Sequence, residues 1–204
     1  GNAYTTWFAN RGGASYDQSI LLPSTVGGGD VAVAIHWTID AANDLIRMAA
    51  AAEATGYLGV GLADAGAMPG ADIAVYTASD GMLTDRYATA YARPDEDQCQ
   101  DWTLVYSDAS DGFIVWEATR ALDTGDTQDR RIVDDSNPAT AATPIIAAYG
   151  DGDLAYHGEN RFKGAVRFYG TGGGSATQSF LQDMANEGAS MRPFTAPAGY
   201  VMPS

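Results

Sequence analysis

Two apolar segments joined by a loop of small residues constrain the fold of this chain more than any other feature. Residues 56–62 and 72–76 are short, hydrophobic and bounded by turn-forming residues, which is typical of buried β-strands. The loop between them consists mainly of Ala and Gly and carries Met68, followed by Pro69. We therefore expect two stiff, buried strands and a loop that brings the soft Met68 thioether close to the space between two sheets.

Short apolar segments and turn signals continue along the rest of the chain. Their spacing, with Gly and Asp at the turns, predicts a β-sandwich rather than a series of β-α-β units. Residues 45–54 are ambiguous because their alanines favour a helix, but the turns on both sides favour a strand that pairs with residues 31–39. The predicted strands span residues 19–22, 31–39, 45–54, 56–62, 72–78, 83–90, 102–106, 113–119, 145–149 and 165–169.

The length of the chain fits one sandwich domain with additional terminal segments. A chain of 204 residues can bury a substantial core without dividing into two domains. Residues 1–30 are predicted to form an irregular N-terminal lead-in, and residues 31–170 the all-β sandwich. Residues 171–204 are predicted to contain a Gly-rich linker, a short helix at 178–186 and an extended tail.

Charge and cysteine content restrict the partners of the chain. It carries 26 acidic and 11 basic residues, a formal charge of −15, which repels nucleic-acid phosphates and anionic lipids. No apolar run approaches the roughly 20 residues that span a bilayer, so we expect no direct insertion into a membrane. Cys99 is the single cysteine, which excludes an internal disulfide and makes it a candidate for a bridge to another domain.

An ordered set of motifs resembles the DOMON domain family, which takes its name from dopamine β-monooxygenase. The motifs are GYLGVGL at 56–62, MPGADI at 68–73, WTL at 102–104, RALDTGD at 120–126 with Asp129, residues 145–150, and residues 156–161. The resemblance covers residues 31–169 and implies an immunoglobulin-like antiparallel β-sandwich, usually extracellular or at the cell surface. In cytochrome members, similar to the electron-transfer domain of cellobiose dehydrogenase, a Met and a His hold a b-type haem. The matching positions here are Met68 and His157, although other members bind sugars or have no known ligand.

The chemistry of Met68 and His157 suits an electron-transferring haem. Thioether and imidazole are an established axial pair, and filling both axial positions leaves none for dioxygen or substrate, so such a site passes single electrons. The alternative is that Met68 fills a gap in the core and that His157 forms a hydrogen bond within its loop. The other histidine, His36, lies in a predicted strand between Ile35 and Trp37, where a histidine is more often structural than a ligand.

Cationic and aromatic residues complete the predicted haem site. Arg161 is the preferred partner for the haem propionates because guanidinium groups form bidentate, charge-assisted hydrogen bonds with carboxylates. The other cations near His157 are Lys163 and Arg167. Their simpler explanation is that they are solvated charges on an edge strand. Aromatic rings in β-sandwiches usually pack in the core, but they can also form the walls of a haem pocket. The aromatic residues considered for this role are Tyr156, Trp37, Tyr76 and Trp102.

Carboxylates offer a second candidate cofactor, calcium, although their spacing matches no EF-hand. The run at 123–135 is more simply explained by turns, because Asp side chains accept hydrogen bonds from turn amides. Two histidines are too few for the several-histidine copper sites of the monooxygenases, and no pair of acids indicates a glycosidase. The acidic residues considered as calcium ligands are Asp95, Glu96, Asp97, Asp123, Asp126, Asp129, Asp134 and Asp135.

The sequence therefore predicts an extracellular or cell-surface domain that binds b-type haem through Met68 and His157 and transfers electrons without being an enzyme by itself. Its redox partner is expected to be a neighbouring domain or another protein. Residues 197–204 faintly resemble the start of a copper monooxygenase module, and a tail that docks on neighbouring copies is equally compatible. The alternative is a haem-free module that binds carbohydrate or protein in an adhesive or structural role. The haem hypothesis predicts that Met68 and His157 approach each other across one cavity, whereas the alternative predicts an exposed aromatic patch and no such pairing.

Overall fold

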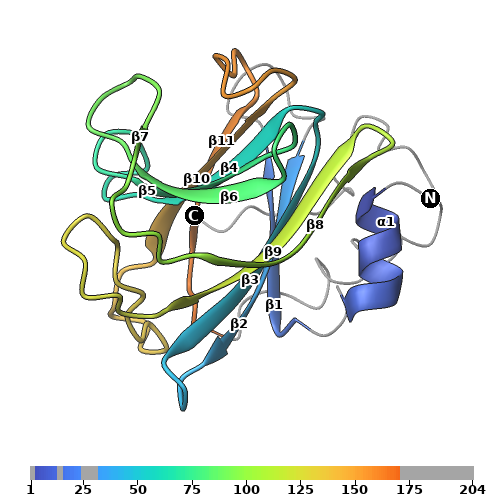
Figure 1. Cartoon of the computed structure of the whole chain (residues 1–204). Coiled ribbons are helices and arrows are strands. Elements are labelled where there is room, and N and C mark those ends of the chain that lie inside the picture. Colours follow the sequence, from blue (N-terminus) through green and yellow to red (C-terminus); the bar gives the residue numbers. More distant parts are fainter. Residues whose placement is uncertain (1–2, 13–15, 24–31, 171–204) are drawn as a thin grey trace.

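Two antiparallel β-sheets pack face to face in the computed structural model, which describes residues 3–12, 16–23 and 32–170 (Figure 1). The predicted all-β sandwich is confirmed. The linker, helix and tail predicted at residues 171–204 lie outside the described residues. None of the helices in the described part of the chain is long and apolar enough to cross a membrane.

The chain alternates between two sheets, which we call sheet A and sheet B. Sheet A has the strand order β1 (Gln18–Pro23), β2 (Ala32–Asp40), β3 (Leu45–Glu53), β9 (Phe113–Ala121) and β8 (Thr103–Ser110). Sheet B has the order β11 (Arg161–Val166), β10 (Thr143–Gly150), β4 (Tyr57–Leu62), β5 (Asp72–Thr77), β6 (Met82–Tyr87) and β7 (Asp95–Glu96). Neighbouring strands are antiparallel, so each strand presents alternate residues to the core and to the outer face of its sheet.

The core lies between the two sheets, and two tryptophans donate hydrogen bonds within it. The indole Nε1 of Trp116, on sheet A, donates to the backbone oxygen of Leu58, on sheet B, at 3.3 Å. Trp37 Nε1 donates to the backbone oxygen of Phe168 at 3.1 Å. Because a buried N–H group without an acceptor is costly, these bonds favour one way of packing the sheets together.

The alanine-rich segment forms strand β3, as the turns on both sides of it predict. Ala49 and Ala51 face the outside of sheet A, where they belong to the same buried cluster as Tyr4 and Trp7 of the N-terminal segment. Small side chains at these positions leave room for the aromatic rings above the sheet. Packing in the folded chain therefore outweighs the intrinsic preference of alanine for helices.

The N-terminal residues differ from the predicted irregular lead-in. Helix α1 (Ala3–Trp7) and the π-helical turn η1 (Phe8–Gly12) lie against the outer face of sheet A (Figure 1). The short strand predicted at residues 19–22 is confirmed as β1. These residues are helical because their aromatic side chains bury an apolar face on the sheet. The turn-forming residues nearby in the sequence mask the helical pattern, so this tertiary contact was not predicted.

His36 is buried beneath this N-terminal segment. Only 1% of its surface is exposed, and its Nε2 lies 3.3 Å from the hydroxyl of Tyr4. Its ring also lies within 5.3 Å of the Trp7 ring, centroid to centroid. Burial lowers the pKa of His36 to about 3, so its imidazole is neutral at physiological pH. His36 is thus part of the packing between α1 and sheet A.

Strand β11 begins four residues before the position that the sequence pattern predicts. It spans Arg161–Val166 instead of residues 165–169. Its pairing with β10 explains the difference, because the hairpin extends to a hydrogen bond from the Tyr149 amide to the Asn160 carbonyl. Charged residues such as Lys163 alternate with apolar ones in this edge strand, and this mixture weakens the strand signal in the sequence.

Candidate functional site

Two glycines lie at the centre of the outer face of sheet B. Along β4 the large residues point into the core, whereas Gly59 and Gly61 lie on the outer face. A Cβ atom at Gly61 would lie 3.0 Å from the side chains of both Ile73 and Ile146, so these isoleucines lean over the glycine. At Gly59 the corresponding distance, to Val75, is an ordinary 3.4 Å. The sequence motif at 56–62 therefore allows apolar side chains of the neighbouring strands to pack closely over β4.

Apolar residues gather around these glycines, and we call the group the outer-face cluster. The outer face of an antiparallel sheet is usually polar, so an apolar, partly exposed surface there indicates contact with a ligand or partner. Three members are only half-buried and line the accessible edge: Met68, Ile146 and Leu154. The buried members of the cluster are Tyr57, Ala63, Ala71, Ile73, Val75 and Ala88.

Met68 lies in the β4–β5 loop, at the end of sheet B where β4 ends. The amide of Ala71 donates to the Met68 carbonyl at 3.0 Å, and the amide of Gly70 donates to the Ala88 carbonyl at 2.7 Å. Gly70 has a φ of 81°, a left-handed conformation that favours glycine. The loop thus places the thioether on the outer face of sheet B, not beside the space between the sheets as the sequence suggested. That inner space is already filled by core side chains such as Leu62.

Arg130 fastens the Met68 loop at two points. Its Nε and Nη2 donate to the carbonyl oxygen of Gly70 at 3.0 and 2.6 Å, and Nη2 pairs with the Asp64 carboxylate at 2.7 Å. Its backbone amide donates to Asp72, at the start of β5, at 2.9 Å. Sequence reasoning missed Arg130 because it lies 60 positions from Gly70, and only the fold brings the two together.

His157 lies in the β10–β11 loop, at the opposite end of β4. Strand β10 pairs antiparallel with β4 and places Gly150 beside Tyr57, so the loop that follows Gly150 starts where β4 begins. The hydroxyl of Tyr57 donates to the Ala155 carbonyl at 3.0 Å, and Leu154 packs against the outer-face cluster. The loops that carry the two predicted ligands are therefore both anchored on one face, at opposite ends of the same strand.

The hydrogen bonding of the His157 imidazole determines which nitrogen is available to a metal. Nδ1 lies 3.0 Å from the backbone oxygen of Gly158. A carbonyl oxygen only accepts hydrogen bonds, so this contact places the proton on Nδ1 and the lone pair on Nε2. Metal-binding histidines are typically oriented in this way by a backbone carbonyl. The side chain is half-buried, which keeps it within reach of a bound group.

The remaining predicted site residues divide between this loop and the core. Tyr156 is 82% exposed, and its ring centroid lies 4.9 Å from that of His157. Arg161 is exposed and donates from Nη1 to the Gly158 carbonyl at 3.0 Å. The structure therefore brings these two residues close to His157. The aromatic residues that lie in the core between the sheets, away from Met68, are Trp37, Tyr76 and Trp102.

Carboxylates in the run at 123–135 mostly act in turns, which confirms that interpretation of the sequence. Asp126 accepts a hydrogen bond from the Gln128 amide at 2.7 Å, and Asp134 accepts one from the Ser136 amide at 2.9 Å. Asp129 differs from them, because it lies beside two buried carboxylates that sequence reasoning did not single out. These two, on β5 and β6, are Asp72 and Asp85.

Comparisons with proteins of known structure support the fold. The structure is similar to the cytochrome domain of Myriococcum thermophilum cellobiose dehydrogenase, with a TM-score of 0.51 and 12% identity, over 82% of this chain and 89% of that domain. It was also matched to the cytochrome b domain of pyranose dehydrogenase from Coprinopsis cinerea, with a TM-score of 0.48 and 17% identity, over 77% of this chain and 87% of that one. At this level of identity, the first similarity shows a common fold.

Sequence comparisons place the chain in a family. It is 28% identical over 165 residues to DBH-like monooxygenase protein 1 from Homo sapiens, an alignment that covers 72% of this chain and 26% of that protein. The chain thus corresponds to about a quarter of the length of this relative. Residues 29–140, more than half of the chain, match the family model of the DOMON domain. The chain therefore belongs to the DOMON domain family.

Proposed function

We propose that this chain is a b-type haem-binding electron-transfer domain with Met68 and His157 as the axial ligands. The observation that carries the proposal is the anchoring of both loops on one apolar face. Met68 and Leu154, from the two loops, pack against the same outer-face cluster, and Tyr57 fastens the His157 loop to β4. A flat apolar ring held between the two side chains would cover the half-buried cluster residues.

The residues on this face suit the chemistry of haem. Met68 offers a thioether, and His157 offers an imidazole whose Nδ1 is already hydrogen-bonded to a backbone carbonyl. Gly61 lets Ile73 and Ile146 lean over β4, so the surface that the bound group would meet is apolar. When bound, the haem supplies reversible one-electron oxidation and reduction. The protein's part is to hold the group, occupy both axial positions and exclude water from one side.

Two further residues have proposed roles beside His157. Arg161 is exposed at the end of the same loop, where its guanidinium can pair with a propionate carboxylate. Tyr156 lies against the His157 ring and would cover an edge of the bound group. Trp37 has no role in this proposal, because it is buried in the core.

The proposed setting is a larger extracellular or cell-surface redox protein, or a pair of separate redox partners. The alignment with a quarter of a monooxygenase-like protein supports the first arrangement. In either case the outer face of sheet B is the proposed route for electrons, because the haem edge would be exposed there. A strongly acidic chain, with a formal charge of −15, would favour a partner that presents a basic surface.

The alternative, a haem-free binding module, requires an exposed aromatic patch. Among the described residues, the large aromatic side chains with high exposure are Tyr91, at 79%, and Tyr156, at 82%. They belong to different loops, after β6 and after β10. Two separate tyrosines are weaker support for a sugar platform than the shared face is for haem.

Visible absorption spectra of the full chain, oxidised and then reduced with dithionite, test the proposal. We expect the chain, purified from its source or supplied with haemin, to show a sharp Soret band and intensified α and β bands on reduction, as six-coordinate low-spin haem does. Met68→Ala and His157→Ala should each weaken haem retention or convert the iron to a five-coordinate form. Met82→Ala, at a methionine that is 55% exposed on β6, is the matched control.

Either of two results would contradict the proposal. The first is a wild-type chain that takes up no haem under these conditions. The second is an unchanged low-spin spectrum in both ligand variants, which would leave haem binding in place but would require other ligands.

A further inference from the structure

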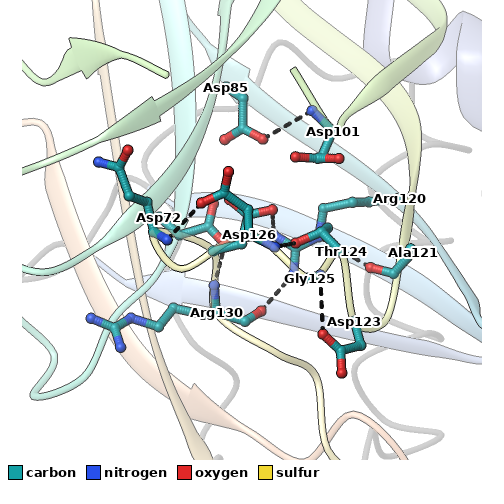
Figure 2. A network of polar contacts seen from close by, with 12 residues as sticks. Asp72, Asp85, Asp101, Arg120, Ala121, Asp123, Thr124, Gly125, Asp126 and Arg130 are labelled. Carbon is teal, nitrogen blue, oxygen red and sulfur yellow. Dashed lines mark hydrogen bonds and ion pairs between the residues drawn. The ribbon is translucent and has the colours of Figure 1, made fainter. Parts of the chain in front are cut away.

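A buried carboxylate cluster lies inside the sandwich, at one end of the core. Asp72 stands at the start of β5, Asp85 lies on β6, and Asp129 lies in the segment after β9; we call these three residues the carboxylate cluster. Asp85 pairs in register with Ala74, a core residue, so both strands direct their carboxylates inward. Figure 2 shows this region with Asp72, Asp85 and the guanidinium of Arg120.

The carboxylates are almost fully shielded from water. The exposed fraction is 2% for Asp72 and 1% for Asp85, and the side chain of Asp129 is 4% exposed. The Oδ1 atoms of Asp72 and Asp85 and the Oδ2 atom of Asp129 have no hydrogen-bond partner in the structure. A buried acceptor without a partner costs about 1–3 kcal/mol, and a buried charge costs more. Three neighbouring carboxylates that each keep an oxygen without a partner therefore call for a missing cation or proton.

Charge is also unbalanced within the cluster. Three carboxylates contribute −3 when ionised, and the buried guanidinium of Arg120 contributes +1, leaving −2. Arg120 Nη1 lies 2.5 Å from Asp72 Oδ2 and 3.9 Å from Asp129 Oδ2. Arg130 contributes only its backbone amide to Asp72, since its guanidinium is bound to Gly70 and Asp64. A single divalent cation would neutralise the remaining charge.

Distances within the cluster match the coordination sphere of one ion. One carboxylate oxygen from each of Asp72, Asp85 and Asp129 lies within 4.8 Å of the other two. Oxygen ligands bind Ca²⁺ at about 2.3–2.6 Å, so two ligands of the same ion are separated by at most about 5 Å. The three oxygens also come from different segments, as is needed to surround an ion.

We propose that Asp72, Asp85 and Asp129 bind a calcium ion inside the end of the sandwich. All three ligands are hard carboxylate oxygens, which suit Ca²⁺, whereas zinc and copper prefer nitrogen and sulfur ligands. Mg²⁺ demands a near-ideal octahedron and retains several waters, which fits a closed, irregular protein cage poorly.

Further acidic residues lie next to this site. Carboxylate oxygens of Asp97 and Asp126 lie within 4.8 Å of one from Asp129; Asp97 is 9% exposed, and Asp126 is half-buried. Asp126 in turn lies within the same distance of Asp101, whose Oδ2 is buried without a partner. The inner cluster is thus adjacent to a further group of carboxylates.

Calorimetric titration of the EDTA-treated full chain with CaCl₂ tests the proposal, together with thermal unfolding with and without Ca²⁺. We expect one Ca²⁺ per chain and a rise in the unfolding midpoint of roughly 5–10 °C at a hundredfold excess over Kd. Mg²⁺ at the same concentration should produce a smaller rise. These measurements on the wild-type chain decide the proposal even where a variant does not fold.

Variants identify the ligands. Asp129→Asn removes one ligand charge at the least buried position and should weaken Ca²⁺ binding about tenfold or more, and Asp85→Asn should do the same. The matched control is Asp111→Asn, an exposed turn residue with a φ of 51° that asparagine also tolerates. The proposal is overturned if the wild-type chain shows no binding heat and no shift with Ca²⁺, if Mg²⁺ binds better, or if both variants bind Ca²⁺ as tightly as the control.

Discussion

The guanidinium of Arg130 holds the carbonyl oxygen of Gly70 through two hydrogen bonds, from Nη2 at 2.6 Å and from Nε at 3.0 Å. Gly70 lies two residues after Met68, and the same Nη2 pairs with Asp64 on the other side of the loop. One side chain thus spans the loop that carries the proposed methionine ligand. Removing it should affect the position of Met68 without removing any side chain of the outer-face cluster.

Arg130→Ala is expected to loosen the Met68 loop. Loss of charge-assisted hydrogen bonds to a partly buried carbonyl should lower the free energy of unfolding by about 2 kcal/mol in urea titrations. In haem-loaded protein, the same variant should show a growing high-spin fraction. Arg131→Ala is the control, because that side chain is 68% exposed and its ion pair with Asp123, at 3.3 Å, is worth about 0.5 kcal/mol. Equal effects of the two variants would count against a special role for Arg130.

Tyr57→Phe is expected to release the His157 loop from β4. The variant keeps the ring in the outer-face cluster but removes the hydrogen bond to the Ala155 carbonyl, which should cost about 1 kcal/mol. Amide hydrogen exchange should become faster in residues 151–160 and unchanged in β3. Tyr91→Phe, at a side chain that is 79% exposed, should alter neither measurement. Unchanged exchange in the loop would show that other contacts hold it.

His36 is expected to make the fold sensitive to acid. The pKa of His36 is about 3 in the folded chain, whereas the ordinary value of 6.5 applies to the unfolded chain. Between pH 6.5 and pH 3, the unfolded chain therefore binds a proton that the folded chain does not. The stabilisation is therefore complete above pH 6.5 and is lost as the pH falls towards 3. The tyrosines beside it, Tyr4 and Tyr16, have raised pKa values and stay neutral in this range.

The contribution of His36 can be measured by comparing the wild-type chain with His36→Gln. Between pH 7.5 and pH 5, the wild-type chain should lose about 2 kcal/mol more unfolding free energy than the variant. Carboxylates titrate in both proteins and cancel in the difference. Parallel stability curves would mean that the folded chain accommodates a protonated imidazole.

Arg120→Met is expected to destabilise the chain strongly in calcium-free buffer. Arg120 is fully buried and compensates Asp72 and Asp129, so its removal leaves uncompensated buried charge, at a cost of about 3–5 kcal/mol near pH 7. The loss should be smaller at pH 5, because burial raises the pKa of Asp129 to about 6 and that of Asp85 to about 8, and protonated carboxyls need no cation. Urea titrations at both pH values measure the difference. Arg120 also packs over the ring of Trp102, with its Cζ 5.0 Å from the ring centroid, and an equal loss at both pH values would indicate that this packing dominates.

The strands of the sandwich were largely predictable because their signals are local. Alternating β-branched residues and Gly or Asp turns lie within a few positions of each other, and nine of the ten predicted strands overlap the observed β1–β6 and β8–β10. The last prediction, at 165–169, overlaps only the end of β11, because that edge strand mixes charged and apolar residues. The helical turns at residues 3–12 were missed because they depend on contact with sheet A.

Motif order was enough to select Met68 and His157 as candidates, since a family signature is a property of the sequence itself. The tertiary structure decided that Met68 lies on the outer face of sheet B and that Trp37 lies in the core. It also brought together Asp72 and Arg120, 48 positions apart, and Arg130 and Gly70, 60 positions apart. A local sequence pattern indicates which face of a strand is apolar. The partners of a buried charge depend on how segments that are distant in the sequence pack together, and no local pattern contains that information.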